Sequence, residues 1–454
     1  MKEEILQYWK PEAEDQFAGD MMPFWDGRQY HLFYLLDRDH HAEQGGLGGH
    51  QWAHASTSDL VHWEHYPLAL PIGEPGSIDQ HGICTGSIFE HDGVFHAFYA
   101  TRVQAADGSV SEVVCRAVSR DLIHFDKSAD NPMFAPPPDY DQGSHRDPFV
   151  FQHPETGTFH MLVTASQGGR GVLAHYTSEN LDDWHLQEPF LVGRDGHSPE
   201  CPELFCWNDW WYLVYSHDAQ LEYRISRSPL GPWQTARRET IESPTLRVPR
   251  TAAFGDGRRL AVGFLAWRQD SRDSGEYVYA GNVVFRELLQ DADGTLSTKL
   301  VPEMMPPAGL PKVEKSVSVE AGSSVVTIGI ADVPADCTLT FQIVPTAGTD
   351  EFGLLLRADA QMKTGYRLRF LPEEKRVTLQ SWPDDAVPIA VVSGMEGLAQ
   401  PIKVIICLKS SVIDVCLNDR HTLIERGFDY RGTTLGFFAA NGAASLEGLT
   451  ISPI

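Results

Sequence analysis

The stretch GDMMPFW (residues 19–25), followed by the turn Asp26-Gly27 and the run YHLFY (residues 30–34), decides the fold of this chain. A turn of Asp and Gly between two runs rich in aromatic and apolar residues predicts a β-hairpin, because glycine accepts the positive φ that such a turn requires. The same order of parts recurs in four later segments. These segments are residues 85–99, 146–163, 200–215 and 251–264. We therefore predict five copies of one β-rich unit.

A second marker follows each of the first four hairpins. It reads DLVHW at residues 59–63, DLIHF at 121–125, NLDDW at 180–184 and PLGPW at 229–233. Four short strands repeated at this spacing are typical of β-propeller blades, which stand around a central channel. A β-sandwich would not predict the same aromatic residues at the same place in successive units. We therefore predict an all-β chain that begins with a five-bladed β-propeller, the expected catalytic domain, at residues 1–300.

The pattern changes after a proline-rich stretch at residues 301–312, which predicts a linker. Beyond it, runs such as residues 339–343 and 366–370 alternate in hydropathy with a period of two, as half-buried strands do. Short strands at close spacing predict a C-terminal β-sandwich at residues 313–454. This region holds no cluster of Asp, Glu or His, so we expect it to support the first domain by packing; binding of sugar is the alternative.

Composition excludes several classes of partner. The chain has 454 residues and a formal net charge of −26, and such an acidic surface repels both nucleic acid and anionic lipid. The seven cysteines are scattered without a CxxC pair, which argues against a disulfide framework or a zinc site. Residues 1–10 contain no apolar run of the signal-peptide kind, so we expect a cytoplasmic location. We expect neither a metal nor another cofactor, and the oligomeric state stays open.

Three acids stand near the start of a repeat. Asp20 lies six residues before its Asp-Gly turn, and Asp147 and Glu200 open the third and fourth copies; Gly86 and Arg250 are expected at the same place in the second and fifth. The first strand of a propeller blade is the innermost one, so acids far apart in sequence are expected to meet in one central pocket. One such acid is equally well explained by turn capping, whereas three at equivalent places indicate a site.

Carboxylates that share a pocket are typical of glycoside hydrolysis. One acid protonates the leaving oxygen, and a second attacks the anomeric carbon or activates water. Crowded like charges push the pKa values apart, so that one carboxyl group stays protonated and serves as the acid. The 11 tryptophans suit sugar binding, although most aromatic rings in such a chain are expected to be core.

The residues around these acids resemble those of glycoside hydrolase family 32, which comprises invertases, fructanases and fructosyltransferases. Arg146-Asp147-Pro148 and Glu200-Cys201 match the Arg-Asp-Pro and Glu-Cys motifs of that family, and YHLFY (residues 30–34) matches the strand that follows its nucleophile. Residues 52–63 are similar to its Trp-Gly-His-Ala stretch and the sequel, and Cys84-Thr85-Gly86-Ser87 to its Phe-Ser-Gly-Ser motif. The resemblance covers essentially the whole chain and also implies a propeller followed by a sandwich.

The resemblance implies a role for each acid. Asp20 is the nucleophile that forms a covalent glycosyl-enzyme intermediate, Glu200 is the acid/base, and Asp147 stabilises the transition state. Such a retaining mechanism requires the first two carboxyl groups to lie about 5–5.5 Å apart. The expected reaction removes terminal β-D-fructofuranosyl residues, or similar furanosyl residues, from sucrose-like substrates or short fructo-oligosaccharides. Substrate-binding residues are expected at Arg146, Trp52, Thr85, Ser87 and Trp267, with core positions as the alternative for Trp52 and Trp267.

The sequence departs from the family pattern near the presumed nucleophile. Gly19 stands where the family has a sugar-binding Asn, and Leu35 stands where a Gln usually follows the Phe-Tyr pair. Two hydrogen bonds to the first sugar are thus missing. The polar stretch Asp37-Arg38-Asp39-His40-His41, and Asp37 in particular, is expected to replace them. A solvated loop explains this stretch better than a metal site, which needs organised ligands and a second shell.

Three other functions stay open. A fructosyltransferase, or an enzyme that forms a cyclic difructose anhydride, would share the fold and the acids. An inverting arabinofuranosidase or xylosidase on a related propeller would have a wider gap between its carboxyl groups and an inverted product. A non-catalytic sugar-binding propeller would bind without turnover and would tolerate Glu200→Gln.

Overall fold

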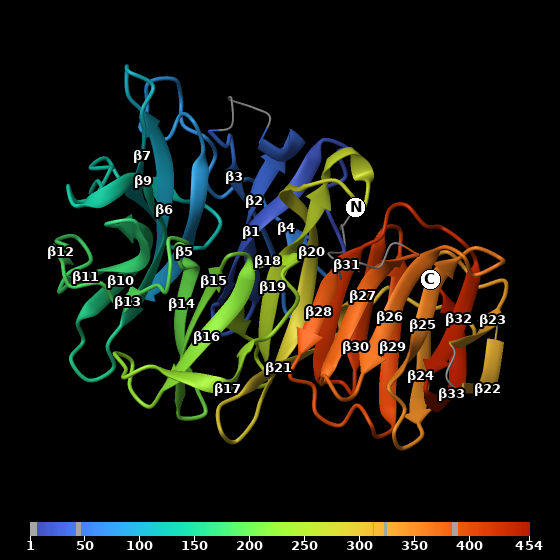
Figure 1. Cartoon of the computed structure of the whole chain (residues 1–454). Helices are drawn as coiled ribbons and strands as arrows, with labels where there is room; N and C mark the ends of the chain where they lie inside the picture. Colours follow the sequence, from blue (N-terminus) through green and yellow to red (C-terminus); the bar gives the residue numbers. More distant parts are fainter. Residues whose placement is uncertain (1–6, 42–46, 312, 322–324, 384–388) are drawn as a thin grey trace.

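The computed structural model describes residues 7–41, 47–311, 313–321, 325–383 and 389–454 (Figure 1). Within these ranges the regular elements are β-strands and three-residue 3₁₀ turns: η1 (Asp39–His41), η3 (Gln269–Ser271) and η4 (Pro302–Met304). The prediction of an all-β chain is confirmed. The described residues contain no helix of the length and apolar character needed to span a membrane.

In the described part of the chain, residues 16–299 form five antiparallel units of four consecutive strands, with a fifth, short strand in unit 3; units 1 and 5 are joined in one eight-stranded sheet. Unit 1 comprises β1 (Gln16–Trp25), β2 (Tyr30–Arg38), β3 (Gln51–Thr57) and β4 (Glu64–His65). Unit 2 comprises β5 (Ile83–His91), β6 (Val94–Gln104), β7 (Val110–Ser119) and β8 (Asp126–Lys127). Unit 3 comprises β9 (Tyr140–Gln152), β10 (Phe159–Gln167), β11 (Arg170–Ser178) and β12 (His185–Leu186), with the short β13 (Leu191–Val192) beside β11. Unit 4 comprises β14 (Glu200–Trp207), β15 (Trp210–His217), β16 (Gln220–Ser226) and β17 (Gln234–Thr240). Unit 5 comprises β18 (Leu246–Ala253), β19 (Arg259–Arg268), β20 (Tyr277–Gln290) and β21 (Leu296–Lys299).

The predicted hairpins form at the Asp-Gly turns. Gly27, Gly93 and Gly257 join the first two strands of units 1, 2 and 5, with φ values of 93°, 73° and 88°. These left-handed conformations are the reason for glycine at each turn.

The second marker is also a local turn. Leu60, Leu122 and Leu181 adopt φ values of 66°, 62° and 64°, and each side chain is buried. Burial of the leucine explains why this left-handed turn recurs with an apolar residue.

The first strands of the five units form a closed ring. β1 contacts β5, β5 contacts β9, β9 contacts β14, β14 contacts β18, and β18 contacts β1 again. The ring has one seam with backbone pairing, where Ala18 of β1 lies opposite Gly281 of β20. A closed ring of this kind is what the predicted propeller requires, and it brings the starts of five strands together.

Each first strand carries a β-bulge at the same place, where two residues are skipped in the pairing with the second strand. The last paired residues before the bulge are Ala18, Ile83, Arg146, Glu200 and Arg247. The first paired residues after it are Met21, Gly86, Phe149, Glu203 and Arg250. A bulge bends its strand and redirects side chains, so these positions project differently from those of a regular strand.

This register corrects the expected equivalence of the three acids. Glu200 precedes its bulge, Asp147 is the first bulged residue and Asp20 is the second, while Gly86 and Arg250 follow theirs. Alignment on the hairpin turns missed this difference because the hairpins differ in length. The three acids therefore occupy three successive positions of the repeated bulge.

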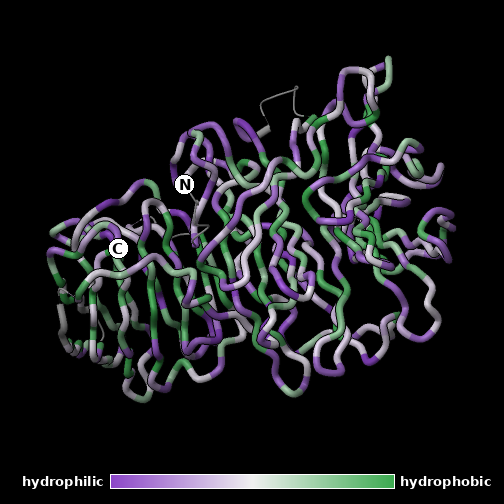
Figure 2. The backbone as a smooth tube through the Cα atoms, turned by 180° about the vertical axis from the view of Figure 1, so that it is seen from behind, coloured by the Kyte–Doolittle hydropathy of each residue, from purple (hydrophilic) through white to green (hydrophobic). Residues whose placement is uncertain are grey.

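Two six-stranded sheets follow the ring (Figure 1, orange to red). One contains β22 (Val313–Ala321), β33 (Gly442–Pro453), β24 (Cys337–Pro345), β29 (Ile402–Lys409), β30 (Val412–Leu417) and β31 (His421–Arg426). The other contains β23 (Val326–Ile330), β32 (Thr434–Ala440), β25 (Glu351–Ala358), β26 (Gly365–Leu371), β27 (Arg376–Trp382) and β28 (Ala390–Ser393). Both sheets contribute buried side chains to one apolar core, whose buried members among the described residues lie between Val319 and Ile451. Figure 2 shows hydrophobic segments along the strands of both parts.

Buried charges join the two parts. Arg286 of β20 pairs with Glu242 (2.7 Å) and with Asp414 of β30 (2.9 Å), and all three side chains are almost fully buried. Glu425 of β31 accepts hydrogen bonds from Thr245 (2.7 Å) and from Tyr277 at the start of β20 (2.8 Å). The second sheet system therefore reaches the strand ends that surround the centre of the ring.

Candidate active site

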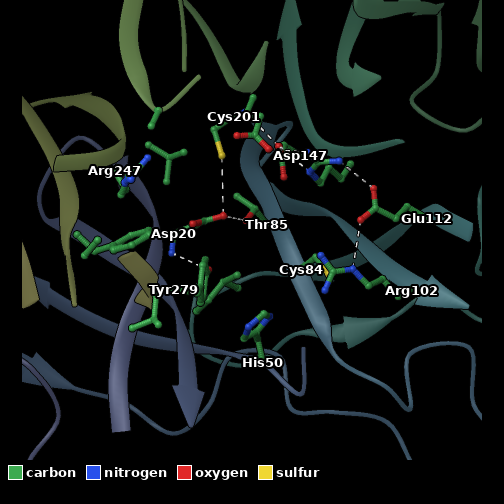
Figure 3. Close-up of a pocket in the computed structure, with 18 of the residues that line it drawn as sticks. Asp20, His50, Cys84, Thr85, Arg102, Glu112, Asp147, Cys201, Arg247 and Tyr279 are labelled. Atoms are coloured by element: carbon green, nitrogen blue, oxygen red, sulfur yellow. Dashed lines mark hydrogen bonds and ion pairs between the residues drawn. The ribbon is translucent and has the colours of Figure 1, made fainter. Parts of the chain in front are cut away.

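A cavity of about 670 Å³ lies at the centre of the ring (Figure 3). Residues at or next to the bulges of all five first strands line it, and the pairing described above explains why they point inward. These lining residues are Asp20, Cys84, Thr85, Arg146, Asp147, Glu200, Cys201, Arg247 and Val248. The structure therefore brings the three predicted acids together with Thr85 and Arg146 in one pocket.

Asp20 is half-buried in this cavity. Its Oδ2 atom accepts a hydrogen bond from the Thr85 hydroxyl and lies 3.9 Å from Sγ of Cys201. Burial of the carboxyl group and, next, the negative charge of Asp147 raise the pKa of Asp20 to about 6, although the bond from Thr85 acts in the opposite direction. A carboxyl group with such a pKa is ionised at neutral pH and is still close to its titration range.

Asp147 lies beside Asp20. One carboxylate oxygen from each of the two acids and Sγ of Cys201 all lie within 4.8 Å of one another. The Asp147 Oδ2 atom accepts hydrogen bonds from the hydroxyl of Thr164 (2.9 Å) and from the backbone N–H of Cys201 (3.1 Å). These two donors hold the carboxyl group of Asp147 in a fixed direction. The backbone of Asp147 is left-handed (φ 55°), as is that of Cys201, the first bulged residue of the next unit (φ 51°).

Glu200 is partly open to solvent, with 38% of its side chain exposed. Its Oε1 atom accepts a hydrogen bond from Nη2 of Arg146 at 2.5 Å. Arg146 also lies 3.3 Å from Glu112 and 3.9 Å from Asp147. Burial alone would lower the pKa of Arg146, but the surrounding carboxylates raise it well above its ordinary value. Arg146 is therefore a permanent cation that orients Glu200 at the side of the pocket.

Sequence reasoning missed several pocket residues. Glu112 on β7 accepts from Arg102 on β6 (3.2 Å) as well as from Arg146. Neither Arg102 nor Glu112 belongs to a first strand, and neither follows a motif. Arg247, in contrast, stands at the position of Glu200 in the next unit and would have been found from the correct bulge alignment.

Tyr279 explains the departure at Gly19. A Cβ atom on Gly19 would lie 2.4 Å from the Tyr279 hydroxyl oxygen, so the tyrosine fills the space that a side chain would need. The same hydroxyl accepts a hydrogen bond from the backbone N–H of Asp20 (3.1 Å). Leu35 also lines the pocket. The pocket wall beside Asp20 is therefore built from an aromatic ring and an aliphatic side chain.

Two expected substrate-binding residues lie behind the pocket wall instead of on it. Trp52 is fully buried, and its Nε1–H donates to the carbonyl of Cys84 (2.9 Å). Ser87 is buried and donates to the carbonyl of Pro148 (2.8 Å). Both side chains bond the backbone of bulged residues, and neither lines the cavity, so their contact with substrate stays a prediction. They support the strands that carry the acids.

Asp37 and Trp267 are also outside the pocket lining. Asp37 is fully buried and lies 3.1 Å from Nε2 of His50, which does line the pocket. Trp267 packs against Phe17, with ring centroids 5.8 Å apart. The expected direct contacts of Asp37 and Trp267 with substrate are thus not supported. Burial of Asp37 explains the difference.

The polar stretch after Asp37 packs on the site wall. The ring of His40 stacks on Phe17, with 3.9 Å between centroids, and its Nδ1 atom lies 2.6 Å from the carbonyl oxygen of Tyr279. The side chain of His41 lies outside the described residues. His40 is thus engaged in holding Tyr279.

Two groups among the described residues bring three possible metal-ligating atoms together: Asp20, Asp147 and Cys201, and Asp195, His197 and His217. Burial raises the pKa of the Cys201 thiol well above its ordinary value, which disfavours the thiolate that a metal needs. In the second group, the Arg194 guanidinium lies 2.7 Å from Nδ1 of His217, so Nε2 of that ring donates to Asp195 (2.9 Å). Neither group is organised as a metal centre.

Comparison with known proteins agrees with this geometry. Residues 20–241 match the model of the glycosyl hydrolases family 32 N-terminal domain. The chain is 24% identical to sucrose-6-phosphate hydrolase of Escherichia coli over 452 residues, which cover 93% of this chain and 89% of that protein. Among solved structures, fructan 1-exohydrolase IIa of Cichorium intybus in complex with 1-kestose superposes with a TM-score of 0.74 at 15% identity, over 100% of this chain and 98% of that one. Sucrose-6-phosphate hydrolase of Lactobacillus gasseri gives a TM-score of 0.72 at 17% identity, over 99% and 93% of the two chains.

The family match begins at Asp20 and includes Asp147 and Glu200, so it spans the three acids that meet in the pocket. The all-β ring holds clustered carboxylates, and the relatives are sucrose-6-phosphate hydrolases. The chain is therefore a glycosidase, and its residues 20–241 match glycoside hydrolase family 32.

Proposed function

We propose that this glycosidase is a retaining β-fructofuranosidase, which removes terminal β-D-fructofuranosyl residues from sucrose-like substrates or short fructo-oligosaccharides. The observation that carries the proposal is the meeting of Asp20, Asp147 and an Arg146-bound Glu200 in one cavity of about 670 Å³. A cavity of this size suits a small carbohydrate. The names of the relatives support fructosides as the substrate class.

Asp20 acts as the nucleophile. With a pKa of about 6 it is mostly ionised at neutral pH, and its Oδ2 atom is directed by the Thr85 hydroxyl. Attack of this oxygen on the anomeric carbon forms a glycosyl ester and breaks the bond to the leaving oxygen. Formation of the ester removes a negative charge on Asp20 that burial and the nearby Asp147 destabilise, and this favours the step.

Glu200 acts as the acid and then as the base. It gives its proton to the leaving oxygen, and in the second half of the reaction it takes a proton from the water that opens the ester. Its partial exposure is consistent with the entry of that water. Asp147, fixed by Thr164 and Cys201, binds ring hydroxyls and stabilises positive charge on the sugar in the transition state.

We infer that the five units are the blades of a five-bladed β-propeller at residues 1–300 and that the two later sheets form a β-sandwich at residues 313–454. The closed ring of first strands supports the first inference. The separate apolar core of residues 319–451 supports the second. Residues 301–311 connect the two parts through η4 and an extended stretch.

The test is a substrate panel followed by NMR: sucrose, 1-kestose, inulin, levan, an aryl arabinofuranoside and an aryl xyloside. We expect cleavage of the fructosides with β-fructofuranose as the first product anomer. An inverted first anomer, or cleavage of the arabinofuranoside or xyloside alone, contradicts the proposal. Accumulation of longer or cyclic oligosaccharides at high sucrose would show transfer in place of hydrolysis.

A further inference from the structure

Glu112 is a buried carboxylate of the pocket to which the proposed reaction gives no role. It stands on β7, the third strand of unit 2, so it belongs neither to a first strand nor to a bulge. Only 3% of the residue is exposed, yet it lines the cavity. A buried carboxylate destabilises a protein unless it is paired, so the partners of Glu112 indicate its role.

Three donors hold the Glu112 carboxylate in place. Its Oε1 atom accepts from Nε of Arg102 on β6 (3.2 Å; Figure 3). Its Oε2 atom accepts from the backbone N–H of His145 (3.0 Å) and from Nη1 of Arg146 (3.3 Å). Arg102 is itself anchored, because its Nη1 donates to the carbonyl of Leu47 (3.1 Å). Glu112 is therefore a fixed acceptor for Arg146.

Each nitrogen of the Arg146 guanidinium faces a different acid. Nη1 donates to Glu112 at 3.3 Å and Nη2 to Glu200 at 2.5 Å. Nε lies 3.9 Å from Asp147. A guanidinium is planar and rigid, so a contact that fixes one nitrogen also fixes the direction of the others. The bond to Glu112 therefore determines where Nη2 lies beneath the carboxyl group of Glu200.

The Glu200 carboxyl group depends on Arg146 for its direction. Over the described ranges, Arg146 is the only side chain that forms a hydrogen bond with it. Asp147, in contrast, is also held by the Thr164 hydroxyl and by the backbone of Cys201. A partly exposed glutamate has several accessible rotamers, so this one contact selects among them. A displacement of Arg146 would thus displace the proposed acid.

Glu112 also affects the charge around Glu200. It is paired with two arginines, which favour its ionised form. Its negative charge offsets part of the attraction that the Arg146 cation exerts on a Glu200 carboxylate. Glu112 therefore helps Glu200 to keep the proton that the leaving oxygen requires. The charged and titratable groups around Glu112 and Glu200 are Asp20, Cys84, Arg102, Arg146, Asp147, Cys201 and Arg247.

We propose that Glu112 is a positioning residue of the reaction, which fixes Arg146 in the orientation that directs Glu200 and balances its charge so that Glu200 acts as an acid. The inference rests on the proposed β-fructofuranosidase function. Glu112 acts through Arg146, and it makes no contact with the reacting atoms in this scheme.

The first measurement is the pH dependence of kcat/KM for sucrose in the wild type and in Glu112→Gln. The amide keeps the shape and an acceptor oxygen but removes the charge. The full positive charge of Arg146 then favours loss of the Glu200 proton, so the fall of kcat/KM at alkaline pH should begin roughly 0.5–1 pH unit lower. Glu112→Asp keeps the charge and should move this limb less. A limb that stays in place or moves to higher pH in Glu112→Gln overturns the inference.

The second measurement varies the leaving group. Glu112→Gln should lower the maximal kcat/KM for sucrose about tenfold, because the acid is less well placed. The loss for 4-nitrophenyl β-D-fructofuranoside should be less than about threefold, since nitrophenolate departs with little help from an acid. Equal losses for the two substrates would show that the acid step is not affected, and would overturn the inference.

A double-mutant cycle with Arg146→Met tests whether Glu112 acts through Arg146. In the Arg146→Met background, Glu112→Gln should change kcat/KM less than about threefold, because no guanidinium is left to position. Losses that multiply would indicate direct contact of Glu112 with substrate and would overturn the inference. Thermal unfolding checks that each variant is folded.

Glu222→Gln is the matched control. Glu222 is an equally buried carboxylate on the third strand of unit 4, pairs with Arg194 (2.7 Å) and is not part of the cavity lining. Its replacement should leave both the maximal rate and the alkaline limb unchanged. A wild-type protein that cleaves no fructoside would instead contradict the proposed function itself.

Discussion

A Cβ atom on Gly19 would lie 2.4 Å from the hydroxyl oxygen of Tyr279, and that hydroxyl accepts the backbone N–H of Asp20. Tyr279 therefore fits beside Asp20 only because residue 19 has no side chain. It fixes the backbone of the proposed nucleophile from a strand 259 residues away.

Gly19→Ala should lower kcat and destabilise the protein by about 1–3 kcal/mol, because the added methyl group forces Tyr279 away from Asp20. In the Tyr279→Ala background the same change should cost much less, since the space is then free. Thermal unfolding and initial rates of the four proteins in the cycle measure this coupling. Additive effects of the two changes would contradict the packing relationship.

The raised pKa of Asp20 predicts the acidic limb of the pH–rate profile. The nucleophile must be ionised, so kcat/KM should fall about tenfold for each pH unit below about 6. Thr85→Val removes a hydrogen bond that lowers this pKa and should therefore move the limb to higher pH. The pH–rate profiles of both proteins test this direction. An acidic limb that stays in place or moves to lower pH in Thr85→Val would show that a group other than Asp20 causes the limb.

The raised pKa of Asp20 also predicts that this carboxyl group lowers the stability of the folded protein. A carboxyl group whose pKa is higher in the folded than in the unfolded state destabilises the fold as the pH rises through the interval from about 3.8 to about 6, and the cost then stays constant. Asp20→Asn should consequently raise stability by about 1–3 kcal/mol at pH 7–8 and by less at pH 4. Denaturant unfolding at the two pH values measures the difference in free energy of unfolding. An equal increase for Asp20→Asn at both pH values would contradict the assignment to the Asp20 carboxyl group.

Glu200→Gln should reduce kcat on sucrose by about 10²–10⁴-fold, because the amide cannot donate the proton that the leaving oxygen requires. Substrate affinity should change little, since the amide keeps the shape of the side chain and its oxygen can still accept from Arg146. Glu155→Gln on an exposed turn of unit 3 is the control. Rates and calorimetric affinities separate the two effects; full activity in Glu200→Gln would favour a sugar-binding role over catalysis.

The parts of the molecule that depend on local sequence were predictable. The Asp-Gly turns at Gly27, Gly93 and Gly257 form hairpins because their conformation is decided by neighbouring residues. The bulges were not predictable, because the register of a first strand is decided by pairing with its second strand. A slip of one or two residues there changed which residue of each unit is equivalent to Glu200, and Arg247 was overlooked for that reason.

The candidate site was also predictable only in part. Motifs located Asp20, Asp147, Glu200, Thr85 and Arg146, all of which line the cavity. Motif similarity could not tell which face of a strand Trp52 occupies, and the side chain turned out to support the wall from behind. Glu112 and Tyr279 reach the pocket from outer strands, so only the three-dimensional arrangement reveals them.

The seam of the ring, where Ala18 lies opposite Gly281, adjoins Asp20 directly. The pairing makes β1 part of one continuous sheet with β18, β19 and β20, so closure of the circle and placement of Asp20 depend on the same contact. A crosslink across the junction should therefore raise the denaturant concentration at which turnover is lost. The position that closes the circle is thus also a position on which catalytic competence depends.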